Sequence, residues 1–212
     1  MTDKIVIIIG AGGHARVVAD ALLASGRRVL GFIDANPATH GRELLGLPVL
    51  GADAILDGVS RSDTELANGI GSAGSMDARY RVYQTAVERG FRFATVMHPG
   101  AMVATSATLG PGVQVMARAV VQPMAVVGEN SIINTGAIIE HDVMVGSHVH
   151  ISPGCVLAGE ARVGDLVHVG VGSVVIQRMS IGARSLVAAG AVVVNDVPDG
   201  SKVIGVPARV HA

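Results

Sequence analysis

From residue 103 onward, every sixth residue of the chain is valine, isoleucine or leucine. The series runs through sixteen positions without a break: Val103, Leu109, Val115, Val121, Val127, Ile133, Ile139, Val145, Ile151, Leu157, Val163, Val169, Val175, Ile181, Val187 and Val193. A period of six matches neither the turn of an α-helix nor the two-residue alternation of a simple strand. It predicts a parallel β-helix, in which each coil has a short strand and a turn on three sides and the aliphatic residue points inward.

Three such hexads make one coil of 18 residues, so the repeat predicts a little over five coils. Stacked at the spacing of β-strands, these coils form a prism about 25 Å tall. Small residues often follow the aliphatic position and let the chain turn a corner, as at Gly110, Gly128, Gly146, Gly164, Gly170 and Gly182. The chain has 28 glycines but no Trp, 2 Tyr and 3 Phe, which also favours thin aliphatic layers. A β-sandwich, the alternative, would hold this phase only by coincidence.

The residues before the repeat show a different pattern. It predicts apolar strands over 4–9, 29–33 and 66–70, an amphipathic helix that ends at Gly26, and a second helix over 76–89 that ends at Gly90. Strands alternating with helices in this way predict a small α/β unit, βαβαβ, with a parallel sheet. We therefore expect two domains, the α/β unit over residues 1–97 and the β-helix with a short C-terminal tail over residues 98–212.

A glycine turn, Gly10-Ala11-Gly12-Gly13-His14, joins the first strand to the first helix. It matches part of a dinucleotide-binding fingerprint, and Asp34 lies about where an acidic residue would bind a ribose. The N–H groups at a helix N-terminus attract anions, and glycines let a ligand approach the backbone. Because the unit is half the size of a full dinucleotide-binding domain, a nucleotide or phosphate is the expected ligand. The alternative is a tight structural turn.

These features together resemble a known family. The pairs Val127-Gly128, Val145-Gly146, Val163-Gly164 and Ile181-Gly182, with the tail Gly205-Val206-Pro207-Ala208-Arg209, resemble the hexapeptide-repeat acyltransferases. With the Gly-Gly-His unit in front, the whole chain is similar to the sugar acetyltransferases of that family. The resemblance implies a left-handed parallel β-helix, a homotrimer with active sites between subunits, and acetyl-CoA as co-substrate. It also implies that the Rossmann-like unit holds a nucleotide-linked amino sugar through Gly12, Gly13, His14, Asp34 and Gly71.

The segment from Asn134 to Asp142 has the residues on which catalysis would depend. The resemblance makes His141 the general base and Asp142 the residue that orients it, although the family usually has Glu in place of Asp142. His141 lies two positions after an aliphatic residue and should point outward. A sugar ammonium must lose a proton before it attacks a thioester, and histidine titrates near neutrality. The acceptor implied is the 4-amino group of a nucleotide sugar, with GDP-perosamine first.

The resemblance also implies residues for acetyl-CoA: His150 near the thioester, the Gly159 amide at the oxyanion, and Val171 and Ala189 along the CoA arm. His168 lies 18 residues after His150 and should stack on it at the surface. Ser152 and Cys155 have no evident base partner. Cys155 falls at an inward position, which predicts direct acyl transfer without a covalent enzyme intermediate.

Other features narrow the class of protein. The formal net charge of -1 gives no case for nucleic acid or an anionic membrane. One cysteine and the absence of a signal-peptide pattern predict a cytoplasmic protein. His148 and His150 form a His-x-His pair, but no pair has the spacing of the zinc β-helix enzymes, so we expect no metal. Three alternatives remain open: a UDP-linked 4-amino sugar as acceptor, O-acetylation of a sugar such as sialic acid, and a non-catalytic nucleotide-sensing or assembly module.

Overall fold

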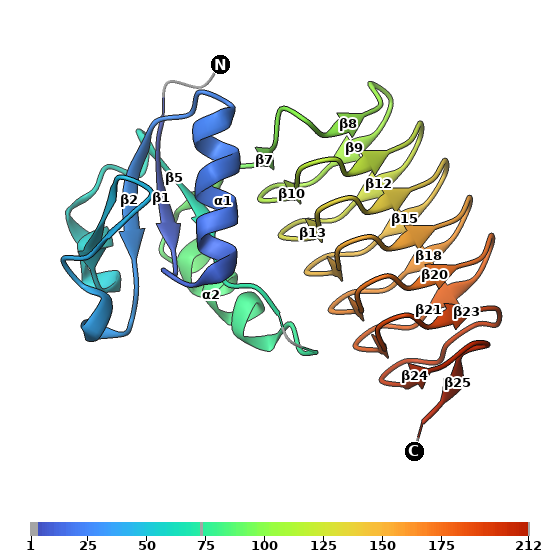
Figure 1. The fold of residues 1–212 in the computed structure, drawn as a ribbon. Helices are drawn as coiled ribbons and strands as arrows, with labels where there is room; N and C mark the ends of the chain where they lie inside the picture. Colours follow the sequence, from blue (N-terminus) through green and yellow to red (C-terminus); the bar gives the residue numbers. More distant parts are fainter. Residues whose placement is uncertain (1–3, 73, 212) are drawn as a thin grey trace.

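The computed structural model describes residues 4–72 and 74–211, and it has two parts (Figure 1). The N-terminal part is a sheet in the order β3-β4-β2-β1-β5-β6, parallel except for β3. Its strands are β1 (Ile5–Ile9), β2 (Val29–Ile33), β3 (Glu43–Leu44), β4 (Leu47–Gly51), β5 (Thr64–Asn68) and β6 (Arg92–Phe93). Its helices are α1 (Gly13–Ala24), α2 (Asp77–Glu88) and the 3₁₀ segments η1 (Pro37–Thr39) and η2 (Asp53–Gly58).

The two α-helices lie on opposite faces of this sheet. Alternate residues of β1 face opposite ways, so Val6 and Ile8 pack in the core that contains α1, and Ile7 and Ile9 in the core that contains α2. Figure 1 shows α1 between the sheet and the prism. The α1 core also includes Met116 of the β-helix, so the two parts share apolar packing.

The sequence prediction was incomplete between β2 and β5. A β3–β4 hairpin and two 3₁₀ segments fill this stretch, and the hairpin turns at Leu45 and Gly46, both with positive φ. The strand predicted over 66–70 is β5, which ends earlier, at Asn68. It ends there because the Asn68 side chain accepts the Ile70 N–H and so turns the backbone out of the sheet.

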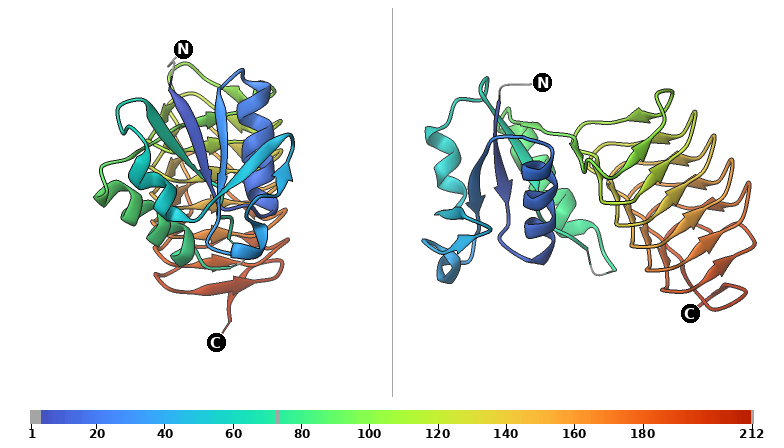
Figure 2. Two further views of the ribbon diagram at one scale, coloured as in Figure 1. Left: turned by 90° about the vertical axis from the view of Figure 1, so that its left-hand side faces the viewer. Right: turned by 45° about the horizontal axis from the view of Figure 1, so that its top comes forward.

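The C-terminal part is a prism of stacked coils with three parallel sheets (Figure 2). The facing sheet, which lies against the N-terminal part, contains β7 (Val96–Met97), β10 (Gln114–Val115), β13 (Ile132–Ile133), β16 (His150–Ile151), β19 (His168–Val169), β22 (Leu186–Val187), β24 (Lys202–Ile204) and the antiparallel β25 (Arg209–Val210). The second sheet contains β8 (Met102–Val103), β11 (Val120–Val121), β14 (Ile138–Ile139), β17 (Val156–Leu157), β20 (Val174–Val175) and β23 (Val192–Val193). The third sheet contains β9 (Thr108–Leu109), β12 (Val126–Val127), β15 (Met144–Val145), β18 (Arg162–Val163) and β21 (Ser180–Ile181).

Strand pairing confirms the 18-residue coil. In the facing sheet, for example, Ile133 pairs with Ile151 and Ile151 with Val169. Every aliphatic residue of the hexad series from Val115 to Val193 is buried, and the first two, Val103 and Leu109, are partly covered. The predicted domain ranges also include residues 1–3, 73 and 212, which lie outside the described residues. The boundary after residue 97 stays a prediction, and β7 already pairs with the next strand of the facing sheet.

Three corners join the sheets in each coil. The first corner leads from the facing to the second sheet (residues 134–137 and their equivalents every 18 residues), the second from the second to the third sheet (140–143 and equivalents), and the third back to the facing sheet (128–131 and equivalents). Glycines recur at the third corner because the coils touch there. A Cβ on Gly128 would come within 2.6 Å of the backbone at Gly146 and Ser147.

Candidate active site

A pocket of about 460 Å³ lies where β1, β2 and β5 end and α1 begins. It is lined by Gly10, Gly12, Gly13, His14, Asp34, Gly69, Ile70, Gly71 and Ser72, and we call it the acceptor pocket. All five residues predicted to hold the nucleotide sugar are among them. Ligands bind at the carboxyl ends of the strands in open α/β sheets. The predicted residues each follow the carboxyl end of a parallel strand, so their positions in the sequence already indicated that they lie together.

The turn that opens the acceptor pocket is held by Asp34. One carboxylate oxygen accepts the Ala11 N–H at 2.6 Å and the other accepts the Asn36 N–H at 2.8 Å. The N-cap residue of α1 is Gly12, and no side chain caps the helix. The first-turn N–H groups of α1 are therefore available to an anion such as a phosphate.

His14 lies at the border between the pocket and the prism. Its Nε2 is 2.8 Å from Oε1 of Gln114, and the orientation of the Gln114 amide is fixed because its nitrogen donates to the Asn68 carbonyl. Burial, assisted by the charge of Arg79, lowers the pKa of His14 to about 4. His14 is thus neutral near pH 7, with the proton on Nε2. Its Nδ1, which has no partner among the described residues, is left as a hydrogen-bond acceptor.

Arg79 is a functional residue that the sequence did not reveal. Its side chain is fully buried and contacts no carboxylate among the described residues; it donates instead to the carbonyls of Asn68, Ile70 and Asn130. The Asn68 carbonyl is at the end of β5, the Ile70 carbonyl is in the wall of the acceptor pocket, and the Asn130 carbonyl is in the prism. Arg79 therefore fixes the pocket loop and attaches it to the β-helix. Desolvation lowers the pKa of the guanidinium to about 9.

His150 lies in the facing sheet, beside the pocket, and is 6% exposed. Its Nδ1 is 2.7 Å from the Ser72 hydroxyl, and its Nε2 is 2.9 Å from the Asn134 amide nitrogen. Burial lowers the pKa of His150 to about 3, helped by the neighbouring His168, His14 and Arg79. Both ring nitrogens are thus already used within the chain. His168 stacks edge-on at 5.2 Å between ring centroids, as predicted, but it is partly buried rather than on the surface.

His141 and Asp142 occupy the second corner and point outward, with side chains 58% and 54% exposed. The His141 Nδ1 lies 2.8 Å from an Asp142 oxygen, so the shorter aspartate reaches the ring. This hydrogen bond raises the pKa of His141, partly opposed by desolvation and supported by the charges of Asp142, Glu140 and Glu160. It also places the proton of the neutral ring on Nδ1 and leaves the Nε2 lone pair free to accept a proton.

The predicted acetyl-donor residues lie at two corners. Gly159 is one coil beyond His141 at the second corner, and Val171 and Ala189 are one coil apart at the first. The backbone N–H groups of these three residues have no hydrogen-bond partner among the residues described. Beside Val171 and Ala189 runs a column of open, positive-φ glycines: Gly136, Gly154, Gly172 and Gly190. Free donors along an open backbone strip fit the amide-rich arm of CoA.

Within one chain, His141 lies away from the acceptor pocket. His150 belongs to the facing sheet, and the acceptor pocket belongs to the α/β unit that lies against this sheet. His141 lies at the corner opposite the facing sheet, half a coil from it in either direction. One chain thus brings the acceptor residues together but keeps them apart from His141. Cys155 is buried, and its thiol donates to the Gly170 carbonyl, so it belongs to the core.

Residues 4–72 and 74–211 contain neither a candidate metal site nor a membrane-spanning helix. No group of three or more His, Cys, Asp or Glu side chains is placed to hold a metal ion. No helix in this part of the chain is long and apolar enough to cross a membrane.

A glycine-lined pocket on a Rossmann-like unit, joined to a hexad β-helix with an exposed His–Asp pair, is the arrangement expected of a sugar-modifying acyltransferase. Two family models match the chain: PglD N-terminal domain over residues 5–86, and bacterial transferase hexapeptide (six repeats) over residues 124–159. No curated protein sequence matches it.

Solved structures match over nearly the full length. PerB from Caulobacter crescentus, in complex with CoA and GDP-perosamine, is 40% identical, with 98% of this chain and 97% of that one covered and a TM-score of 0.90. The acetyltransferase domain of PglB from Neisseria gonorrhoeae is 35% identical, with 98% and 100% covered and a TM-score of 0.91. The chain belongs to the hexapeptide-repeat sugar N-acetyltransferases with an N-terminal Rossmann-like unit, and it is an acetyl-CoA-dependent acyltransferase with a left-handed β-helix.

Proposed function

We propose that this chain transfers the acetyl group of acetyl-CoA to the 4-amino group of GDP-perosamine. The relative that binds both CoA and GDP-perosamine is 40% identical across nearly the whole chain. Structures of that Caulobacter crescentus enzyme also exist with a histidine, likewise numbered 141, replaced by alanine or asparagine. The observation that carries the proposal is the exposed His141–Asp142 pair, because it supplies a base on the outside of a prism whose N-terminal unit has a nucleotide-type pocket.

In this proposal, His141 accepts the proton that the sugar amine loses. The hydrogen bond from Nδ1 to Asp142 directs the Nε2 lone pair outward and stabilises the ring once it is protonated. The amine attacks the thioester carbonyl of acetyl-CoA directly, so that a C–N bond forms and the C–S bond breaks. CoA leaves as the thiol, with the proton that His141 took from the amine. The free N–H of Gly159, one coil beyond His141, suits the oxygen that gains negative charge.

We propose that the acceptor pocket holds the nucleotide sugar through Gly12, Gly13, His14, Asp34 and Gly71. The α1 N-terminus suits its phosphates, and the free Asp34 lone pairs suit a ribose hydroxyl. The neutral His14 offers Nδ1 as an acceptor for a donor group of the ligand. Val171 and Ala189 take the CoA arm, and His150 supports the thioester end through its bond with Asn134.

The active enzyme in this proposal is a homotrimer. Because His141 lies opposite the facing sheet, a neighbouring copy must bring its second corner to the acceptor pocket of this one. Exposed apolar side chains on the outer sheets and the second corner, including Met102, Met124 and Met144, also favour coverage by another copy. We place the reaction in the cytoplasm, on the way to a bacterial surface glycan such as O-antigen.

A thiol-release assay tests the reaction. Purified protein and acetyl-CoA are mixed with GDP-perosamine, a UDP-linked 4-amino sugar, free sialic acid or no acceptor. CoA release with GDP-perosamine is the expected result. Release with the UDP sugar alone would move the proposal to that nucleotide, and release with sialic acid alone would indicate O-acetylation. A folded trimer that releases no CoA above the acceptor-free rate would contradict the proposal.

Mixed trimers test the shared site. His141→Ala removes the base from one chain, and His14→Ala removes a wall of the acceptor pocket from another. Each pure variant should lose most of its activity, whereas subunits exchanged between the two should recover part of it. Failure of the mixture to recover any activity would place both residues in one chain's site.

A further inference from the structure

Ser72 joins two histidines that come from successive coils. Its hydroxyl oxygen lies 2.7 Å from Nδ1 of His150 and 2.7 Å from Nδ1 of His168. Ser72 is also the residue at which the loop after β5 lines the acceptor pocket. A single hydroxyl has one proton, so it donates to one ring and must accept from the other.

The direction of these hydrogen bonds follows from Asn134. The Asn134 side-chain oxygen accepts the Thr135 backbone N–H at 2.8 Å, so its amide nitrogen must face His150. An amide nitrogen only donates, which makes Nε2 of His150 the acceptor and places the proton of the neutral ring on Nδ1.

The remaining contacts then have one consistent arrangement. His150 donates from Nδ1 to Ser72, and the Ser72 hydroxyl donates to Nδ1 of His168. The proton of His168 is then on Nε2, which faces the Ser152 hydroxyl at 3.5 Å. The chain of bonds runs from the acceptor pocket, through Ser72 and His150, to Asn134 and Thr135 at the first corner.

We propose that Ser72 is a positioning residue that sets the tautomer of His150 and thereby couples the acceptor pocket to the first corner. This inference rests on the proposed function, in which the acetyl donor lies along that corner beside Val171 and Ala189. A ligand that fixes the conformation of the loop around Gly71 and Ser72 also fixes the orientation of the His150 ring and, through it, of the Asn134 side chain. The Ser72 hydroxyl then holds the acceptor site and the donor site in a fixed relative position.

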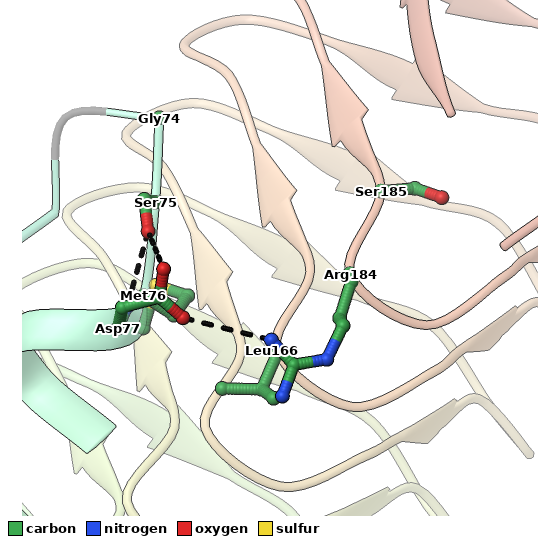
Figure 3. Close-up of a pocket in the computed structure, with 7 residues that line it drawn as sticks. All are labelled: Gly74, Ser75, Met76, Asp77, Leu166, Arg184 and Ser185. Carbon is green, nitrogen blue, oxygen red and sulfur yellow. Dashed lines mark hydrogen bonds and ion pairs between the residues drawn. The ribbon is translucent and has the colours of Figure 1, made fainter. Parts of the chain in front are cut away.

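Ser75 provides a matched control. Figure 3 shows its hydroxyl bound to Asp77, whose carboxylate reaches Arg184 of the prism at 3.6 Å. Ser75 thus belongs to the same segment and supports another contact between the two parts, but none of its contacts involves a histidine.

The first test is the tautomer of His150, read from the ¹⁵N chemical shifts of its ring with His150→Gln used for assignment. We expect Nδ1–H in the wild type, a mixture of tautomers in Ser72→Ala, and Nδ1–H again in Ser72→Thr, which keeps the hydroxyl. Ser75→Ala should match the wild type. A wild-type ring protonated on Nε2, or an unchanged ring in Ser72→Ala, would overturn the inference.

The second test is kcat/KM for GDP-perosamine, with unfolding midpoints measured alongside. Ser72→Ala leaves two buried ring nitrogens without their partner, so we expect kcat/KM to fall about tenfold. Ser72→Thr should recover it and Ser75→Ala should not change it. A changed tautomer with full kcat/KM would overturn the coupling. If the wild type does not use GDP-perosamine, the proposed function fails, but the ¹⁵N shifts still decide whether Ser72 sets the tautomer.

Discussion

The ring of His141 lies directly against Gly159 in the next coil. A Cβ built on Gly159 would come within 2.6 Å of both Cε1 and Nε2 of His141, nearer than side chains approach in real structures. The absence of a side chain at position 159 therefore decides where the base can sit, and it leaves the Gly159 N–H uncovered beside it.

Gly159→Ala should displace the His141 ring without unfolding the coil, since Gly159 does not have a positive φ. We expect kcat to fall on the order of 10- to 100-fold, because small displacements of a catalytic group have effects of this size. The measurement is steady-state CoA release. Gly58→Ala, where a Cβ would meet nothing within 4 Å, is the control. Full activity in Gly159→Ala would show that the ring position seen here is not the working one.

Asp142→Asn tests the pairing with His141. The hydrogen bond and charge of Asp142 raise the pKa of His141, so removing the charge should lower that pKa. A general base acts when neutral, and the acidic limb of the kcat/KM profile should therefore move to lower pH. The maximum rate should fall as well, because a less basic ring accepts a proton less readily. Asparagine suits this position, where φ is +59°. If the acidic limb of the kcat/KM profile does not move, a group other than His141 causes that limb.

The buried histidines should make the fold sensitive to acid. Folded-state pKa values of about 4 for His14 and about 3 for His150 lie below the unfolded value of 6.5. The unfolded chain therefore binds more protons in this range. Stability is complete above pH 6.5 and is lost as pH falls toward 4 and then 3, by a few kcal/mol. Urea unfolding across this range measures the loss. His14→Gln should reduce the slope between pH 6.5 and 4 by about half, because His150 still contributes there, and an unchanged slope would contradict this prediction.

Arg79→Met should loosen the attachment of the α/β unit to the prism. It leaves the carbonyls of Ile70 and Asn130 without their donor, whereas the Asn68 carbonyl keeps the Gln114 amide, which predicts a loss of about 2 kcal/mol or more. Urea unfolding gives the change in stability, and the KM for the nucleotide sugar should rise with it. Arg81→Met, two residues along the same helix but exposed, is the control. Equal stability of the two variants would show that the buried guanidinium does little.

The repeat determined much of this structure in advance. An aliphatic residue at every sixth position fixes which positions of each hexad point inward and which point outward. The inward residues from Val115 to Val193 and the outward His141 could therefore be predicted from their positions in the repeat. The acceptor pocket was predictable because strand ends of a parallel sheet meet at one edge, which gathers Gly12, Asp34 and Gly71.

The contacts between the two parts could not be predicted in this way. Arg79 follows no periodic pattern that marks it as buried, and its partners are backbone carbonyls, which every residue has. Ser72 likewise meets its histidines only because the loop after β5 reaches the facing sheet. Gln114 was a possible signal, since it is a polar residue directly before an inward valine in a strand that proved to be fully buried.

Because the coils stack regularly, equivalent residues lie at even intervals along the first corner, so a bound donor reaches more of them the longer it is. His150 and Ala189 lie about two coils apart, a rise of roughly 10 Å at the strand spacing. A donor that extends along this corner crosses successive coils, and the coils of Val171 and Ala189 each offer it a free N–H, whereas Pro153 at the equivalent position has none. An acetyl thioester of cysteamine would reach the His150 end of the corner but would not extend to Val171 and Ala189. The prism would then select its donor by length as well as by chemistry.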